Sequence, residues 1–200
     1  MSRHANLKPP NSGQIERGSN SCTSIANVPR DGDAGTPPAA GARAAEPQEG
    51  EHRYTFVWAY QLNVFSAFSL CQLCAPHMEQ AGGGAILIIS SMAGENKNVR
   101  LASYGSSKAA ANHLARNIAF DLGPKGIRVN AIAPGAIRTD ALATVLTPEV
   151  EKAMLKHTPL ARLGQPADIA YAALFLCSPA SAWVSGQVLT VSGGGVQELE

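Results

Sequence analysis

Hydrophobic and polar residues occur along this chain in blocks whose length and period predict alternating strands and helices. A continuous apolar run, which is typical of a strand buried on both faces, occupies 85–89, and two further segments that are typical of strands occupy 127–132 and 187–191. Helical periods or helix-start signals fill the intervals at about 56–80, 103–122, 147 onwards and 165–177. This order of elements predicts an α/β fold with a parallel, doubly wound sheet.

Glycine and proline residues mark the ends of these elements. Glycines 82–84 separate the first helix from the first strand, and Gly123-Pro124 ends the alanine-rich second helix. Thr147-Pro148-Glu149 combines a capping residue, a proline and an early acid, which predicts a helix start. Pro76 predicts a bend in the first helix. The large apolar residues of that helix fall on one stripe: Trp58, Leu62, Phe65 and Leu73.

The N-terminal quarter of the chain differs in composition from the rest. Residues 1–52 contain no Phe, Tyr or Trp, and they include six prolines and six glycines. Such a segment buries too little apolar surface to offset the entropy lost when a backbone becomes ordered. We therefore predict a disordered tail at 1–55 and a folded part at 56–200. A targeting or partner-binding tail is the alternative.

Charge and composition exclude several classes of protein. The net charge of +1 lacks the clustered basic excess of a nucleic-acid-binding protein. No apolar window approaches the roughly 18 residues of a membrane span, and no apolar stretch near the N-terminus predicts a secretory signal. Four cysteines are too few for a disulfide scaffold, which favours a reducing, cytoplasmic location.

Cys71 and Cys74 form a Cys-x-x-Cys pair, a spacing found in zinc and redox sites. The pair lies inside a predicted helix, and no second such pair occurs. This context favours two thiols that pack within the helix. No histidine has a ligand spacing, so no metal site is predicted.

Three polar residues follow the first predicted strand at suggestive positions. Ser91 lies at its carboxyl end, the edge where open α/β sheets bind ligands. Tyr104 and Lys108 are four residues apart on the next helix and therefore share one face. A lysine ammonium near a tyrosine favours the phenolate form, and a serine hydroxyl can hydrogen-bond a substrate oxygen. Taken alone, the residues also fit a capping serine, a surface tyrosine and a solvated lysine.

The spacing of Ser91, Tyr104 and Lys108, between a hydrophobic strand and an alanine-rich helix, resembles the short-chain dehydrogenase/reductase family. The resemblance extends over 56–200 and includes RVNAIAPGAIRT at 128–139, LGQPADI at 163–169 and WVSGQVLTVSGG at 183–194. Within the family, segments 91–98 and 191–198 are most similar to bacterial hydroxysteroid dehydrogenases. The resemblance implies an oxidoreductase that transfers a hydride between NAD(P) and a secondary alcohol or ketone, such as a hydroxysteroid.

The resemblance also implies roles for four catalytic residues. Tyr104 is expected to act as the general acid/base, and Lys108 to lie beside it and hold the nicotinamide ribose. Ser91 is expected to orient the substrate oxygen. Asn63 matches an asparagine that holds a relay water, although a polar residue that bends its helix is the simpler interpretation.

The cofactor is expected to contact the turn that ends the second strand. Pro134-Gly135 would turn the backbone so that the main chain of Ile137 binds the nicotinamide carboxamide, and the hydroxyl of Thr139 would reach the carboxamide or pyrophosphate. Tyr104 and Lys108 complete the predicted cofactor contacts. The resemblance favours NAD over NADP.

The family's glycine-rich phosphate-binding turn, with the strands around it, has no match in this sequence. We therefore expect an incomplete, Rossmann-like sheet of three C-terminal strands, an open edge on strand 85–89, and impaired cofactor binding. The alternative function is a truncated, inactive isoform that at most associates with full-length subunits. The helices with Asn63 and Tyr104 are the expected contact for such association or for a homo-oligomer.

Overall fold

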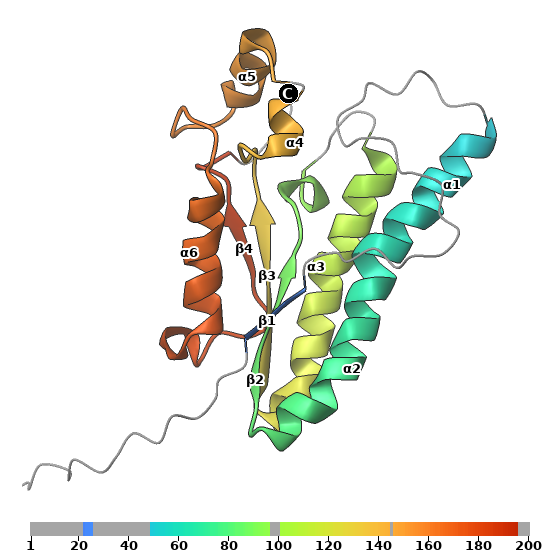
Figure 1. The fold of residues 1–200 in the computed structure, drawn as a ribbon, viewed down its shortest axis with the longest axis vertical. Helices are drawn as coiled ribbons and strands as arrows, with labels where there is room; N and C mark the ends of the chain where they lie inside the picture. Colours follow the sequence, from blue (N-terminus) through green and yellow to red (C-terminus); the bar gives the residue numbers. More distant parts are fainter. Residues whose placement is uncertain (1–21, 26–48, 97–100, 145, 196–200) are drawn as a thin grey trace, which may run out of the picture.

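The computed structural model describes residues 22–25, 49–96, 101–144 and 146–195. One parallel sheet of four strands in the order β1-β2-β3-β4 forms its centre (Figure 1). The strands are β1 (Cys22–Ile25), β2 (Gly84–Ile89), β3 (Ile127–Pro134) and β4 (Val188–Val191). The predicted parallel α/β architecture and the three predicted strands are confirmed.

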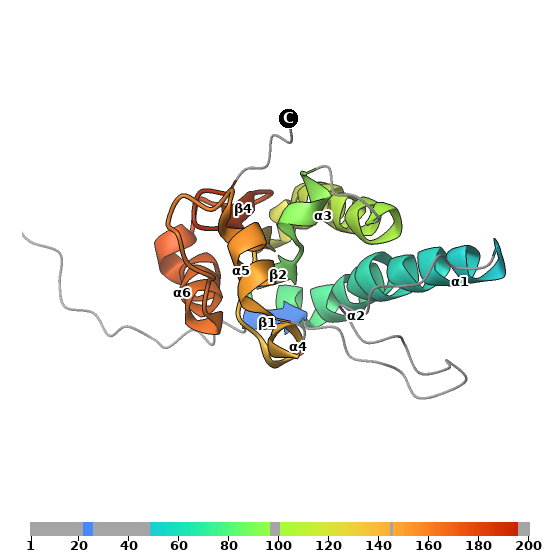
Figure 2. The same cartoon turned by 90° about the horizontal axis from the view of Figure 1, so that it is seen from above.

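Helices cover both faces of the sheet, as Figure 2 shows from above. On one face lie α1 (Glu49–Tyr60), α2 (Ser66–Gln80) and α3 (Ala102–Leu122), and α6 (Pro166–Cys177) covers the other. The short helices α4 (Asp140–Ala143) and α5 (Pro148–Leu155) lie beyond the carboxyl ends of the strands. Thr147 caps α5 as predicted, since its hydroxyl accepts from the N–H of Val150 at 3.3 Å.

The hydrophobic core follows from the two-residue period of the buried strands. In β2, Ile86 and Ile88 face α2 and α3, while Leu87 faces α6. Ile132 of β3 joins Leu87 on the α6 face and is fully buried. Because side chains alternate across a strand, a run that is apolar at every position is suited to a sheet covered on both faces.

The strand β1 corrects the prediction of a three-stranded sheet with an open edge. Cys22–Ile25 pairs in parallel with β2, from Cys22 opposite Ala85 to Ile25 opposite Ile88. The edge of β2 offers unpaired N–H and C=O groups to any short extended segment. Four residues in a polar surrounding are too short to form a recognisable hydrophobic pattern. The rest of the predicted tail up to residue 48 lies outside the described residues, so its disorder stays a prediction.

The first helical segment differs from its prediction in two ways. It begins at Glu49 instead of Phe56, because its polar first turns carry no hydrophobic period. Its buried face consists of small residues, and the expected stripe is exposed: Trp58 is 42 %, Phe65 51 % and Leu73 60 % exposed. The small buried residues are Ala59, Asn63, Ala67, Cys71 and Ala75. Small side chains let this helix lie close to α3, and they leave the large apolar ones outside.

The helix continues through Pro76 to Gln80. Within the described residues, no helix has both the length and the apolar character needed to cross a bilayer.

Candidate functional site

Ser91 lies just beyond the carboxyl end of β2. It precedes a 3₁₀ turn, Met92–Gly94, and its hydroxyl oxygen accepts a hydrogen bond from the N–H of Ala93 at 3.1 Å. This cap holds the side chain in place. Because the oxygen acts as the acceptor, the O–H of Ser91 remains able to donate to a ligand.

Two glycines bring this turn against α3. A Cβ on Gly94 would lie 2.7 Å from the backbone nitrogen of Ala109 and the carbonyl carbon of Lys108, and a Cβ on Gly105 would lie 2.9 Å from the carbonyl oxygen of Ala93. The turn and the helix therefore touch backbone to backbone. This close approach places Ser91 beside the turn of α3 that carries the tyrosine and the lysine.

Tyr104 and Lys108 share one face of α3, as their spacing predicts. The Lys108 ammonium nitrogen lies 5.7 Å from the centre of the Tyr104 ring. Lys108 is only 6 % exposed, and it donates to the carbonyl oxygen of Ile89 at 3.1 Å. Tyr104 is 37 % exposed and therefore accessible to a ligand. The arrangement combines a buried positive charge with a reachable phenol.

Burial lowers the pKa of Lys108 from 10.5 to about 8, because the charged ammonium loses its hydration. No carboxylate among the described residues forms an ion pair with it. At neutral pH the group is therefore charged but close to its titration range.

This pKa predicts how stability depends on pH. Between about pH 8 and 10.5 the unfolded chain binds a proton at Lys108 that the folded chain does not, so the free energy of unfolding rises with pH there. The penalty for burying the charge is fully present below pH 8. In urea unfolding, we expect wild type to gain roughly 3 kcal/mol over this range relative to Lys108→Met. If the free energy of unfolding changed with pH in the same way for wild type and Lys108→Met, the lowered pKa of Lys108 would be contradicted.

Asn63 connects the first helical segment to the site. It lies in a π-helical segment, Gln61–Phe65, and it is buried. Its amide nitrogen donates to the hydroxyl oxygen of Ser107 at 2.9 Å, and Ser107 donates to the carbonyl oxygen of Tyr104 at 2.7 Å. π-Segments within α-helices often occur at functional sites. Asn63 thus supports the backbone turn that holds Tyr104 and Lys108.

The turn after β3 presents free main-chain groups. Pro134 ends the strand, and the N–H of Gly135 donates to the carbonyl of Val191 at 3.0 Å. Ile137 then forms a parallel bridge with Gly164 through its neighbours: Arg138 donates to Gly164 at 2.8 Å, and Gly164 donates to Ala136 at 2.9 Å. In the described part of the chain, the N–H and C=O of Ile137 have no backbone partner.

Thr139 caps α4, since its hydroxyl oxygen accepts from the N–H of Leu142 at 3.2 Å. The predicted ligand contact through its O–H is compatible with this cap, because only the oxygen's acceptor capacity is used. The structure therefore gives Thr139 a local structural role that the sequence resemblance did not state.

These groups fit the nicotinamide and ribose part of a dinucleotide. Two N–H bonds of the Lys108 ammonium donate to no described residue, and the free N–H and C=O of Ile137 match the acceptor and donor of a carboxamide. Tyr104, Lys108, Ile137 and Thr139 would hold these parts. The sequence carries no glycine-rich turn for the pyrophosphate.

Comparisons with known proteins agree with this geometry. A family model described as enoyl-(acyl carrier protein) reductase matches residues 38–195. The 7α-hydroxysteroid dehydrogenase of Escherichia coli K12 is 73 % identical over 141 residues, which cover 70 % of this chain and 55 % of that protein. The chain belongs to the short-chain dehydrogenase/reductase family.

Solved structures of this family share the fold. A 7α-hydroxysteroid dehydrogenase complexed with NADH and 7-oxo glycochenodeoxycholic acid is 72 % identical, with a TM-score of 0.69 over 72 % of this chain and 57 % of that one. A 3-oxoacyl-[acyl-carrier protein] reductase from Brucella melitensis is 37 % identical, with a TM-score of 0.70 over 81 % of this chain and 60 % of that one. The chain spans about half the length of the curated relatives it matches.

Several residues that build this short-chain dehydrogenase/reductase site were not predicted from the sequence. Gly94 and Gly105 set the distance between the serine turn and α3. Ser107 links Asn63 to Tyr104, and buried Ser90 donates to the carbonyl of Lys108 at 3.1 Å. Gly94 and Gly105 lie close in sequence to Ser91 and Tyr104, and this proximity was the sequence signal that could have indicated their role in the site.

The Cys-x-x-Cys pair is part of the core instead of this site. Cys71 is buried in α2, and burial, with a smaller effect of Cys74, raises its pKa to about 11. A thiol with that pKa stays protonated at neutral pH and is a weak nucleophile and metal ligand. No group of three metal-ligating side chains occurs in the described ranges.

Proposed function

We propose that this chain carries the catalytic part of an NAD(P)-dependent oxidoreductase that interconverts a secondary alcohol and a ketone. The observation that carries the proposal is the arrangement at the carboxyl end of β2. There a capped Ser91, an accessible Tyr104 and a buried, charged Lys108 lie on two backbone segments packed together by glycines.

Each side chain has a role that its contacts support. The O–H of Ser91 donates to the substrate oxygen and holds it in place. The Tyr104 Oη accepts the alcohol proton in oxidation and donates it to the carbonyl oxygen in reduction. The Lys108 ammonium places a positive charge beside the ring of Tyr104. When bound, the nicotinamide supplies the hydride acceptor or donor.

We further propose NAD as the cofactor and a hydroxysteroid as the substrate. The support is the high identity to a 7α-hydroxysteroid dehydrogenase whose structure contains NADH and a 7-oxo bile acid. Because the sequence has no glycine-rich phosphate turn, we expect the cofactor to bind weakly, so assays need millimolar NAD.

The test is turnover by the purified chain. Absorbance at the reduced-nicotinamide wavelength should rise with NAD and a 7α-hydroxy bile acid, and a 7β-hydroxy epimer serves as the matched substrate control. No turnover of any secondary alcohol with NAD or NADP, in protein that is folded by circular dichroism, would overturn the proposal. It would favour an inactive chain that associates with full-length subunits.

We also propose that the chain associates with itself through the face of α2 and α3. Large apolar side chains are exposed on these helices, including Phe68 and Leu73 on α2, Phe65 directly before α2, and Phe120, which is 86 % exposed, on α3. Clustered exposed apolar residues often mark association surfaces.

Phe120→Asp should therefore weaken self-association by at least about tenfold, because it puts a charge into an apolar contact. Sedimentation velocity at several concentrations measures the change. Leu160→Asp is the matched control, since Leu160 is 66 % exposed outside these helices. An equal effect of both variants, or none from Phe120→Asp, would count against this surface.

A further inference from the structure

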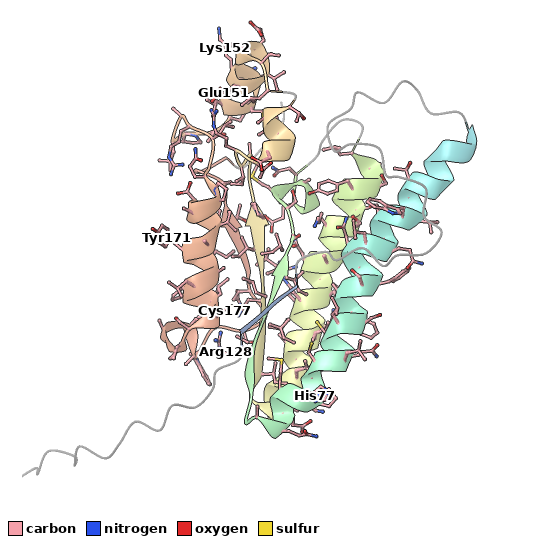
Figure 3. All side chains as sticks on the ribbon, viewed as in Figure 1. His77, Arg128, Glu151, Lys152, Tyr171 and Cys177 are labelled. Carbon is pink, nitrogen blue, oxygen red and sulfur yellow. The ribbon has the colours of Figure 1, made fainter. Side chains whose placement is uncertain are left out.

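A cavity lies at the amino-terminal end of the sheet, at the opposite end from Tyr104. It has a volume of about 710 Å³, which is within the range of small-molecule sites. The starts of β2 and β3 form one side, and the segment from the end of α6 to Ser185 forms the other. Figure 3 shows Arg128 at this end of the molecule, near the lower end of α6.

Arg128 supplies the positive charge of this cavity. Its guanidinium donates to the carbonyls of Leu176 at 2.8 Å and Ser178 at 3.3 Å, and to the hydroxyl of Ser181 at 3.0 Å. It also donates to the carbonyl of Val184 at 3.3 Å. These bonds use only Nη1 and one N–H of Nη2, so two N–H bonds, one of them on Nε, donate to no described residue.

Every partner of this guanidinium is neutral. Among the described residues, no carboxylate forms an ion pair with Arg128. An arginine fork with two spare donors, placed in the wall of a cavity, matches the two oxygens of a carboxylate.

The indole ring of Trp183 lies at the edge of the same cavity. Trp183 belongs to its lining, and its side chain is fully exposed. The other residues that line the cavity have mostly short, apolar side chains; they include Gly82, Gly123, Pro179 and Ala182. An exposed indole over a small-residue floor leaves room for a flat ring to stack.

We propose that this cavity binds a small aromatic carboxylate, with the carboxylate on the spare N–H groups of Arg128 and the ring against Trp183. The positive charge of Arg128 favours an aromatic carboxylate over a neutral aromatic ligand, because a neutral ligand would leave the guanidinium without an anion. This site lies apart from Tyr104 and Lys108, so it does not rest on the proposed oxidoreductase activity.

Two-dimensional NMR of the ¹⁵N-labelled chain tests this with 2-naphthoate as the probe. The chain has two tryptophans, Trp58 on α1 and Trp183, so the Trp58 indole signal is an internal control, assigned with Trp58→Phe. The Trp183 indole signal should shift in a saturable way, and that of Trp58 should stay. Neutral 2-naphthamide should bind at least about tenfold more weakly, the loss expected for a charge-assisted hydrogen bond.

Two variants separate binding from folding. Gly123→Leu adds a side chain at the cavity wall, where a Cβ meets nothing within 4 Å, and it keeps Arg128. It should weaken 2-naphthoate binding at least about tenfold, whereas Ala153→Leu on α5 should not. Arg128→Gln should abolish the preference for naphthoate over naphthamide. Equal affinity for the two probes, shifts of both indoles, or unchanged binding in Gly123→Leu would overturn the proposal.

Discussion

We expect Tyr104→Phe to lower alcohol turnover by about 10²–10⁴-fold, the usual contribution of a positioned acid/base, because phenylalanine has no oxygen to exchange a proton with the substrate. The ring and its contact with the Lys108 ammonium remain, so folding should change little. The measurement is kcat with saturating NAD and a 7α-hydroxy bile acid, together with the dissociation constant for NAD.

The matched control is Tyr171→Phe. Tyr171 lies on α6, is 73 % exposed and points away from the sheet, as Figure 3 shows. Removal of its hydroxyl should leave kcat within about twofold, as for an ordinary surface substitution. If Tyr104→Phe retained more than a tenth of wild-type kcat, the assignment of Tyr104 as the acid/base would be wrong.

Gly94→Ala should destabilise the fold by about 1–3 kcal/mol, the usual cost of overpacking, and should also lower kcat. The added methyl group would lie 2.7 Å from backbone atoms of Lys108 and Ala109, so the turn and α3 must separate. That movement carries Ser91 away from Tyr104 and Lys108. Urea unfolding and steady-state kinetics measure the two effects.

Gly123→Ala is the control for the loss of glycine as such. Gly123 has φ −52° and ψ −47°, and a Cβ there meets nothing within 4 Å. Because Gly123 precedes Pro124, whose ring crowds a Cβ on a helical residue before it, the gain from a more restricted unfolded state is offset, and we expect a stability within about 1 kcal/mol of wild type. A Gly94→Ala protein as stable and active as Gly123→Ala would refute close backbone packing as the device that positions Ser91.

Segments rich in apolar and β-branched residues predicted the three strands well because their physical cause is local. A strand covered on both faces needs an apolar side chain at every position, as at Ala85–Ile88. Helix starts at Thr147 and Gln165 were also readable, since a cap satisfies N–H groups a few residues away. These signals do not depend on the rest of the chain.

The first helical segment shows where such signals fail. Its large apolar residues formed a clear stripe, but the structure buries Ala59, Ala67 and Ala75 and exposes Phe65. Hydrophobicity alone does not record how closely a neighbouring helix approaches. The strand Cys22–Ile25 was missed for a related reason, because its pairing depends on a distant edge of β2.

By itself, the sequence determined the class of sheet, most element boundaries, and the elements on which Ser91, Tyr104 and Lys108 lie, because local hydrogen bonding and residue type set those features. Only the tertiary structure decided how these groups meet. The buried, nearly titrating Lys108 depends on β2 and α3 packing together, and the reach of Ser91 depends on Gly94 touching the backbone of α3. Desolvation and close backbone contact arise between distant segments, so no local pattern encodes their magnitude.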